Sequence, residues 1–327
     1  MQGWRGILRG MTRSAGLALL FVSSTFAADW NPRLAADYLD GRQKEWFAWA
    51  TAKSPGGPCV SCHTGVTYLM ARPALRKVLD EAQRTVYETG LLDGMRARVD
   101  KRESKDIAPL FPKEPAASQA VGVEAIHAAV FLGSREAVDR MWSLQSEDGG
   151  WNWFSLKLDP WEMPPSRFYG AALAARVAGS AKQTAVLKQY LAREQAAQPL
   201  HNRMMLLWLA DAKEAKSIRE ELWKKQQPDG AWTMEALGPW QKPATAANHA
   251  YATSFAALAL LKSGVKPRDA RMRRALDWLA SHQDRATGAW AGESMNKKYP
   301  PESMMVKFMS DAATAYASLA LIEGGRR

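Results

Sequence analysis

Apolar residues recur every three or four positions from about residue 120 to the end of the chain, in stretches separated by short polar turns. Such spacing places apolar side chains on one face of an α-helix, and the strict alternation that marks a β-strand is almost absent. The stretches 246–259 and 312–320 carry small residues on more than one face, as helices crowded by neighbours do. The stretches 213–225 and 268–279 are charged along one side, as helices that face solvent are. The pattern predicts an all-α protein of about eleven helices in an inner and an outer layer.

Three turns of similar composition punctuate this region. They read Gln-Ser-Glu-Asp-Gly-Gly-Trp at 145–151, Gln-Pro-Asp-Gly-Ala-Trp at 227–232 and, more loosely, Gln-Asp-Arg-Ala-Thr-Gly-Ala-Trp at 283–290. Each follows a helical stretch with a tryptophan near its end and precedes an alanine-rich stretch. Glycine adopts the left-handed conformation of a helix C-cap without strain, and the tryptophan that follows can fold back over the helix end. We therefore expect repeated helical hairpins that bury a common core by stacking.

These turns resemble the QW repeats of squalene-hopene cyclases and protein prenyltransferases. The likeness extends to the starts of two inner-helix stretches, His-Ala-Tyr-Ala-Thr at 249–253 and Asp-Ala-Ala-Thr-Ala-Tyr at 311–316, and covers about residues 121–325. It implies an (α/α) toroid of about five to six helical hairpins, in which inner and outer helices alternate around a central cavity. In relatives that cavity often holds an isoprenoid, so the resemblance also implies an apolar ligand.

The catalytic residues of these families do not carry over to this chain. Class II cyclases protonate an alkene with an Asp-x-Asp-Asp motif, which does not occur here, and the nearest aspartates, Asp148 and Asp229, belong to the repeated turns. Zinc-dependent prenyltransferases hold their metal with an Asp, a Cys and a His, but the two cysteines of this chain, Cys59 and Cys62, precede the repeats. We therefore expect neither acid-initiated cyclisation nor prenyl transfer, and we name no catalytic residue.

The N-terminus has the three parts of a secretory signal peptide. Residues 1–14 carry three arginines and no acidic residue, a short apolar stretch follows at 15–22, and small residues stand at Thr25 and Ala27. The apolar stretch is too short to span a bilayer, which disfavours a membrane anchor. We expect cleavage after Ala27 and a mature chain in the periplasm or outside the cell.

The two cysteines form a Cys-x-x-Cys-His motif with His63. Two thiols three positions apart can form thioethers with the two vinyl groups on one haem edge, and the histidine that follows is then held beneath the iron as its proximal ligand. Export agrees with this chemistry, because haem is attached to such motifs outside the cytoplasmic membrane. The motif predicts covalent haem c on Cys59, Cys62 and His63.

Other roles for the cysteine pair are a redox-active dithiol, a structural disulfide or part of a zinc site. A thioredoxin-like pair should open a helix after a buried strand, whereas Pro-Gly-Gly-Pro at 55–58 precedes this pair with no strand pattern around it. A structural zinc site has four ligands, and these usually include a further cysteine thiolate beyond such a pair. This chain has no further cysteine. Haem is the favoured interpretation, and a haem-free protein with a disulfide between Cys59 and Cys62 is the main alternative.

The ligand on the other face of the iron has no motif of its own. Candidates are Met163 in the loop Trp-Glu-Met-Pro-Pro, together with His127 and His249. Such side chains are more often core filler or helix surface than ligands. The loop 151–161 is rich in aromatic residues, which usually pack beneath a long loop but also stack on haem or lipid. We expect Asp311, at the start of the last inner helix, to cap that helix.

On this interpretation the chain divides into three parts. These are the signal peptide at 1–27, a segment with the haem motif and a helical hairpin at 28–115, and the repeat domain at 116–327. Pro109 and Pro112 mark the second boundary. A ring of about six hairpins would need the hairpin of the middle segment, so we favour one compact unit over two separate domains.

Composition and charge limit the partners. Apolar residues make up 47% of the 327 positions, enough for a sizeable core. Lysine and arginine number 44 against 33 aspartates and glutamates, which gives a net charge of +11. A basic surface suits an anionic membrane, but we interpret the charge mainly as a solvated face, and no motif that reads nucleic acid accompanies it. We expect no nucleic-acid partner.

Taken together, these patterns predict a periplasmic haem c protein on a terpenoid cyclase-like toroid. It would transfer electrons with a redox partner protein or bind an apolar ligand, such as an isoprenoid, in a redox-linked way. A haem-dependent enzyme that oxidises an isoprenoid or another lipid is a second hypothesis. A haem-free toroid that binds a peptide or a lipid, with its cysteines in a disulfide, is a third.

Overall fold

The computed structural model describes residues 30–53, 59–101, 113–209 and 212–326. The expected signal peptide, the Pro-Gly run at 55–58 and the prolines at 109 and 112 lie outside the described residues. Within them, the chain forms twelve α-helices and no β-strand, apart from a single bridge between Leu158 and Glu162. The prediction of an all-α fold is confirmed.

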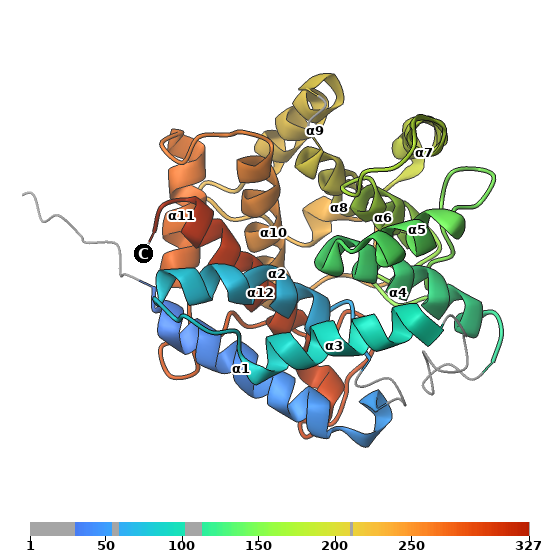
Figure 1. Cartoon of the computed structure of the whole chain (residues 1–327). Coiled ribbons are helices and arrows are strands. Elements are labelled where there is room, and N and C mark those ends of the chain that lie inside the picture. The colour runs from blue at the N-terminus through green and yellow to red at the C-terminus, as the bar shows by residue number, and fades with distance from the viewer. Residues whose placement is uncertain (1–29, 54–58, 102–112, 210–211, 327) are drawn as a thin grey trace, which may run out of the picture.

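The helices alternate between an outer and an inner layer (Figure 1). The helices α10 and α12 are buried along almost their whole length, whereas α7 and α11 bury a single stripe. None of the helices in the described parts combines the length and apolar character needed to cross a membrane. The outer helices are α1 (Pro32–Ala48), α3 (Val86–Lys101), α5 (Arg135–Ser143), α7 (Ala181–Glu194), α9 (Ala212–Lys225) and α11 (Ala270–Ser281), and the inner helices are α2 (Gly65–Val78), α4 (Ala116–Leu132), α6 (Ser166–Ala174), α8 (Leu200–Arg203), α10 (His249–Lys262) and α12 (Phe308–Glu323).

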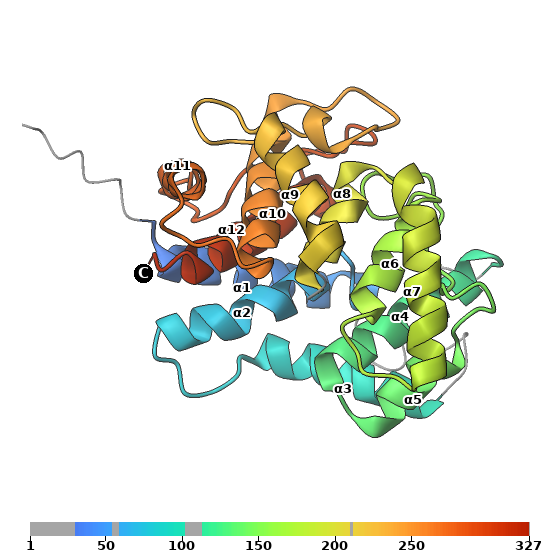
Figure 2. The same ribbon diagram turned by 90° about the horizontal axis from the view of Figure 1, so that it is seen from above.

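The two ends of the described chain lie side by side and close the ring (Figure 2). Helix α12 packs against α10 and α2, and α1 packs against both α2 and α12. In the third repeated turn, a Cβ added to Gly288 would lie 2.3 Å from the carbonyl oxygen of Leu34 in α1. The corresponding glycines of the first two turns, Gly149 and Gly230, approach the backbone of α7 and α11 in the same way. Helix α1 therefore stands where the next outer helix after α11 belongs.

The repeated turns share one tryptophan contact. The indole Nε1 of Trp151, Trp232 and Trp290 donates to a carbonyl near the end of the preceding outer helix, at 2.7, 2.8 and 2.9 Å. The expectation that each tryptophan folds back over the helix end is confirmed. The turn glycines have φ values of 99°, 102° and 77°. Their expected role as helix C-caps is wrong, because α5 already ends at Ser143 and Gly149 bends a separate turn beyond it.

A glutamine in each turn binds the start of the next outer helix. Gln145, Gln226 and Gln283 each donate from Nε2 to the carbonyl of the turn glycine. The same nitrogens also donate to backbone carbonyls at the starts of α7, α11 and α1, at 3.2, 3.0 and 3.0 Å. In the second turn the glutamine is Gln226, one position before the Gln227 that the sequence pattern indicated.

Aromatic side chains fill the middle of the ring of inner helices. His201 Nε2 lies 2.7 Å from the hydroxyl of Tyr251, and the hydroxyls of Tyr169 and Tyr316 lie 3.3 Å apart. Phe255 stacks on Tyr316 with ring centroids 5.1 Å apart. All five side chains are buried. The place where the family resemblance implies a central cavity is therefore occupied by side chains in this chain.

Candidate functional site

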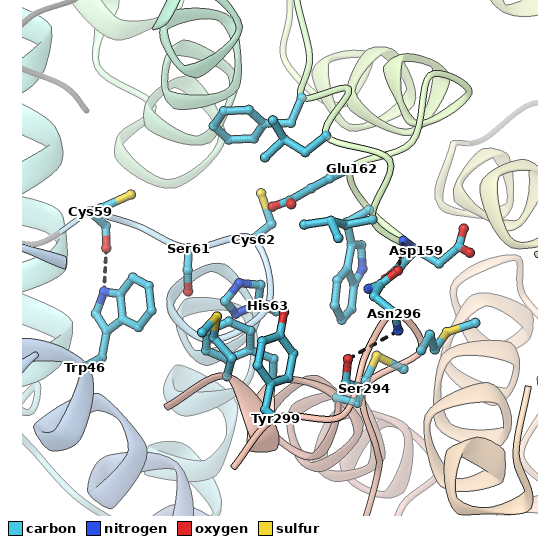
Figure 3. Close-up of a pocket in the computed structure, with 18 of the residues that line it drawn as sticks. Trp46, Cys59, Ser61, Cys62, His63, Asp159, Glu162, Ser294, Asn296 and Tyr299 are labelled. Carbon is cyan, nitrogen blue, oxygen red and sulfur yellow. Dashed lines mark hydrogen bonds between the residues drawn. The ribbon is translucent and has the colours of Figure 1, made fainter. Parts of the chain in front are cut away.

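A partly open, apolar pocket of about 250 Å³ lies at the N-terminal ends of three inner helices (Figure 3). Its walls come from the motif at 59–63 before α2, from the loop 154–162 before α6, and from the segment 294–309 that leads into α12. Besides the motif, the lining consists of the aromatic residues Trp46, Trp49, Phe154, Trp161, Tyr299 and Phe308, the leucines Leu156 and Leu158, the methionines Met295, Met305 and Met309, and the polar residues Asp159, Glu162, Ser294 and Asn296.

Hydrogen bonds hold the motif between α1 and α2. Ser61 Oγ accepts hydrogen bonds of 3.0 Å from the N–H groups of Thr64 and Gly65, and so satisfies two donors at the start of α2. From α1, Trp46 Nε1 donates to the carbonyl of Cys59 at 2.7 Å. The cysteine and histidine side chains therefore line the pocket from a loop that is fixed on both sides.

A chain of hydrogen bonds sets the tautomer of His63. Its Nδ1 lies 3.1 Å from Thr64 Oγ1, and this hydroxyl donates its single proton to Asp311 Oδ2 at 2.7 Å. Because the hydroxyl has no second proton to give, it accepts from His63, so Nδ1 carries the proton and Nε2 a lone pair. Burial and the charge of Arg42 lower the pKa of His63 to about 3, so the ring is neutral at neutral pH. A neutral imidazole whose other N–H is hydrogen-bonded is the form that binds a metal ion.

Asp311 anchors this chain of bonds in the core. Its buried carboxylate accepts from Arg42 at 2.7 and 3.2 Å and from the hydroxyl of Tyr38 at 3.0 Å, and both partners stand on α1. The expectation that Asp311 caps the last inner helix is wrong. Helix α12 begins at Phe308, and Asp311 lies inside its first turn with its side chain bound to α1 and to Thr64. Several donors around one buried carboxylate offset the cost of removing its charge from water.

The surroundings of the thiols disfavour thiolate chemistry. Burial raises the pKa of Cys59 above its ordinary value, and the carboxylate of Glu124, 3.9 Å from its Sγ, raises it further. Burial and the negative charge of Glu162 raise the pKa of Cys62 in the same way. Redox-active cysteines sit in surroundings that lower a thiol pKa. The pair therefore lacks the environment of a thioredoxin-like dithiol, although it does precede a helix.

Glu162 presents its carboxyl to the pocket next to Cys62 (Figure 3). No hydrogen bond or ion pair joins this carboxyl to another residue in the described part of the chain. Burial raises the pKa of Glu162 to about 7, so both protonation states exist near neutral pH. Sequence reasoning missed this residue. The available signal was an acid between Trp161 and Met163, inside an aromatic loop.

The residues considered for the second axial position lie away from the pocket. Met163 lines a neighbouring cavity, where its sulfur accepts from Gln241 Nε2 at 3.0 Å. His127 is buried in α4, with its ring 5.8 Å from that of Trp153. His249 begins α10 and lies near Glu235. None of the three candidates lines the pocket that holds His63.

Three other methionines do line this pocket. Met295 and Met305 come from the segment that leads into α12, and Met309 is the second residue of that helix. The signal that could have found Met305 and Met309 is the density of methionines at 304–309. Among the residues that the structure describes, no group of three or more His, Cys, Asp or Glu side chains could hold a metal ion between them.

Aromatic rings surround His63. The ring of Phe308 stacks on it with centroids 3.5 Å apart, and the rings of Trp46 and Trp161 lie 6.0 and 5.9 Å away. Trp161 belongs to the aromatic loop that sequence analysis singled out, and Phe154 of the same loop also lines the pocket. The loop therefore contributes one wall of the site as well as core packing.

Comparison with known proteins agrees with this architecture. The family model of the squalene-hopene cyclase C-terminal domain matches residues 132–327, a region that begins after the Cys-x-x-Cys-His motif. A squalene-hopene cyclase of Bradyrhizobium diazoefficiens is 31% identical over 102 residues, which are 31% of this chain and 14% of that protein. The chain thus corresponds to a small part of that relative's length.

A solved structure shares the fold. The crystal structure of a protein from Actinoplanes superposes with a TM-score of 0.52 and 15% sequence identity, over 90% of this chain and 100% of that one. The (α/α) toroid that the resemblance to squalene-hopene cyclases implied is confirmed by the family match and by the arrangement of the helices. Because the family model covers more than half of the sequence, the chain belongs to the squalene-hopene cyclase C-terminal domain family.

Proposed function

We propose that this chain is an exported haem c protein, with the porphyrin attached through Cys59 and Cys62 and with His63 as an axial ligand. In this role it transfers electrons with a partner protein or binds an apolar ligand in a redox-linked way. The observation that carries the proposal is the bonded series from His63 through Thr64 to Asp311. It leaves Nε2 with a free lone pair in the pocket that both thiols line.

The donors and walls of the pocket fit this group. The two thiols and the imidazole line one pocket, and most of the other lining side chains are aromatic or aliphatic. The pocket is open on one side, so a planar group larger than the enclosed space can keep one edge toward solvent. Haem c supplies reversible one-electron chemistry at its iron.

The residues of this chain have separate tasks in the proposal. Thr64 and Asp311 orient the imidazole and increase the basicity of its Nε2. The rings of Trp46, Trp161 and Phe308 exclude water from His63. Thioether sulfurs from the segment before α12 stand in the same pocket and offer a soft ligand type for the second axial position.

We place the apolar ligand at the solvent-facing side of this pocket, against the exposed edge of the haem, and not in the middle of the ring. Tyr169, His201, Tyr251 and Tyr316 occupy the middle, where the family resemblance implies a cavity. The pocket at the ends of the inner helices combines apolar walls with an opening to solvent. A ligand that sits there is next to the motif and can respond to its redox state.

Intact mass of the mature protein is the test. The full precursor is expressed in a host with cytochrome c maturation machinery, and the purified protein is analysed by mass spectrometry and by its pyridine haemochrome spectrum. We expect a chain that starts at Ala28 and carries the mass of one haem. The variant Cys59→Ala/Cys62→Ala should carry none and keep the same helical circular dichroism. A mature wild-type chain that weighs no more than its amino acids contradicts the proposal, and a mass lowered by one disulfide supports the haem-free alternative.

A haem-dependent enzyme that oxidises an apolar substrate is the second candidate. The unpartnered Glu162 carboxyl favours it, because an acid that titrates near neutral pH is typical of general acid–base catalysis. Carbon monoxide distinguishes the two roles. A carrier whose iron has two strong axial ligands should resist carbon monoxide in the reduced state, whereas an enzyme with an open position should bind it.

A further inference from the structure

Glu162 differs from the other acidic side chains near the pocket in having no partner. Glu124 and Asp311 form ion pairs with arginines at 3.0 and 2.7 Å, and Asp159 accepts a hydrogen bond of 2.9 Å from a backbone N–H. No described residue offers the Glu162 carboxyl such a bond. Glu162 is half-buried, and a carboxylate that faces an apolar pocket without a donor is costly, so its place in the pocket indicates a functional role.

The loop holds Glu162 in this place. Its backbone N–H donates to the carbonyl of Leu158 at 2.9 Å, and its carbonyl accepts from the N–H of Leu156 at 2.8 Å. The neighbouring carbonyl of Trp161 accepts from Trp153 Nε1 at 2.8 Å. These bonds fix the backbone at Glu162 and at its neighbour, so the loop itself directs the carboxyl toward the pocket.

We propose that Glu162 takes up a proton when the haem site takes up an electron, so that this protein couples electron transfer to proton transfer. The inference rests on the proposed haem c function. A one-electron donor reduces the iron from the ferric to the ferrous state, and a proton from water binds the Glu162 carboxylate. On reoxidation the electron leaves to an acceptor and the proton returns to water, so charge and atoms balance in each direction.

The physical basis is the charge change in a partly open, apolar pocket. Each electron adds one negative charge to the pocket that Glu162 lines, and charges interact more strongly beside apolar walls than in bulk water. A nearby negative charge stabilises the protonated form of a carboxyl and raises its pKa. The pKa of about 7 that burial alone gives Glu162 places this response in the neutral range.

Each of the other titratable groups around the pocket binds the haem, has a partner or titrates outside the neutral range. Glu162 is therefore the group that can take up a proton when the iron is reduced. The others are Cys59, Cys62 and His63, which bind the haem in the proposed function, Glu124 and Asp311, which are ion-paired, Asp159, which is hydrogen-bonded, and Tyr299, whose pKa burial raises further above its ordinary value.

The test is the pH dependence of the haem midpoint potential, measured by spectroelectrochemistry on the haem-loaded mature protein. We expect the wild-type potential to fall with rising pH around neutrality, with a slope that approaches about 59 mV per pH unit, the value for one proton per electron. Glu162→Gln removes the titrating group with little change in shape and should flatten this slope. Glu235→Gln is the matched control, because it removes an exposed carboxyl outside the pocket and should leave the slope unchanged.

A potential that does not vary around neutral pH, or a slope that survives in Glu162→Gln, overturns the inference while the haem itself stays in place. The porphyrin's own carboxylates also titrate, and a surviving slope would be theirs. Absence of covalent haem is a different result, which overturns the proposed function. If Glu162→Gln does not load haem, infrared difference spectra of the wild type with its glutamates labelled with carbon-13 decide the question. A carboxylic acid band that grows on reduction and shifts with the label supports the inference, and the absence of such a band rejects it.

Discussion

Thr64 Oγ1 donates a hydrogen bond of 2.7 Å to Asp311 Oδ2, although 247 positions separate the two residues. The bond joins the turn after the Cys-x-x-Cys-His motif to the first turn of the last inner helix. Asp311 also pairs with Arg42 on α1, so segments from both ends of the described chain meet behind His63. The orientation of the imidazole therefore depends on closure of the ring.

Replacement of Asp311 by Asn should lower the free energy of unfolding by about 3 kcal/mol, because it removes the buried countercharge of Arg42 and leaves that guanidinium only the exposed Glu45 as an ion-pair partner. Urea unfolding of the mature protein measures this loss. The double variant Arg42→Met/Asp311→Leu removes both charges and should lose less than the single variant. A double variant that is less stable than Asp311→Asn would contradict the assignment of the cost to the unpaired charge.

Replacement of Gly288 by Ala should weaken ring closure. The added Cβ would meet the backbone of Leu34 at 2.3 Å, and the φ of 77° is strained for alanine. Gly264→Ala is the matched control, because Gly264 also has a positive φ, 91°, but a Cβ there would meet nothing within 4 Å. We expect a loss of about 1 kcal/mol for Gly264→Ala from backbone strain alone, and a clearly larger loss for Gly288→Ala. Equal losses in urea unfolding would show that the contact with α1 contributes nothing.

The fold could be predicted from the sequence because periodic apolar positions record which helix faces are buried. The alanine-rich stretch 312–320 became the buried α12, and the charged stretch 268–279 became the outer helix α11. The closure by α1 could not be predicted in this way. It depends on the close contact between Gly288 and Leu34, which are 254 positions apart and belong to no shared sequence motif.

Of the site residues, only those that are neighbours along the chain could be predicted from the sequence. Cys59, Cys62 and His63 form one motif, and the structure places all three in one pocket. Asp311 resembled a helix cap because an acid early in a helix usually serves that role, and its partners Arg42 and Thr64 are brought to it only by tertiary packing. The methionines of the pocket and Glu162 were missed for the same reason, since their significance lies in what they face.

Gln226 and Gln227 offer a direct test of the repeated turn. Gln226 Nε2 donates both to the turn glycine and to the start of α11, whereas the exposed Gln227 side chain binds only the nearby carbonyl of Lys225, at 3.3 Å. Gln226→Ala should therefore cost about 1 kcal/mol of stability, since it removes two hydrogen bonds that join the turn to the start of α11, one of them part-buried. Gln227→Ala should change stability by less than about 0.5 kcal/mol. The reverse order in urea unfolding would refute the assignment.

Before haem is attached, the two thiols should react slowly with iodoacetamide. Burial and nearby carboxylates raise the pKa of both Cys59 and Cys62, so little thiolate is present at pH 8. Alkylation of the haem-free protein, followed by mass spectrometry, should be at least about tenfold slower than in urea. Glu162→Gln should speed the reaction of Cys62, because it removes a negative charge from beside that thiol. Native rates equal to those in urea would restore the dithiol alternative.

Stability should fall as the pH drops from about 6.5 toward 4. Burial lowers the pKa of His127 to about 3 and that of His201 to about 4, so below pH 6.5 the unfolded chain binds protons that the folded chain does not.

Glu162 changes the pH dependence of stability in the opposite direction. Its pKa is raised to about 7, so the folded chain binds the extra proton between the ordinary carboxyl pKa and neutral pH, and the stability that this contributes is lost as the pH rises. Urea unfolding of Glu162→Gln should therefore depend more steeply on pH than that of the wild type between about pH 5 and 6, by about 1.4 kcal/mol per pH unit. An unchanged slope would mean that the Glu162 carboxyl titrates in the folded protein as it does in water.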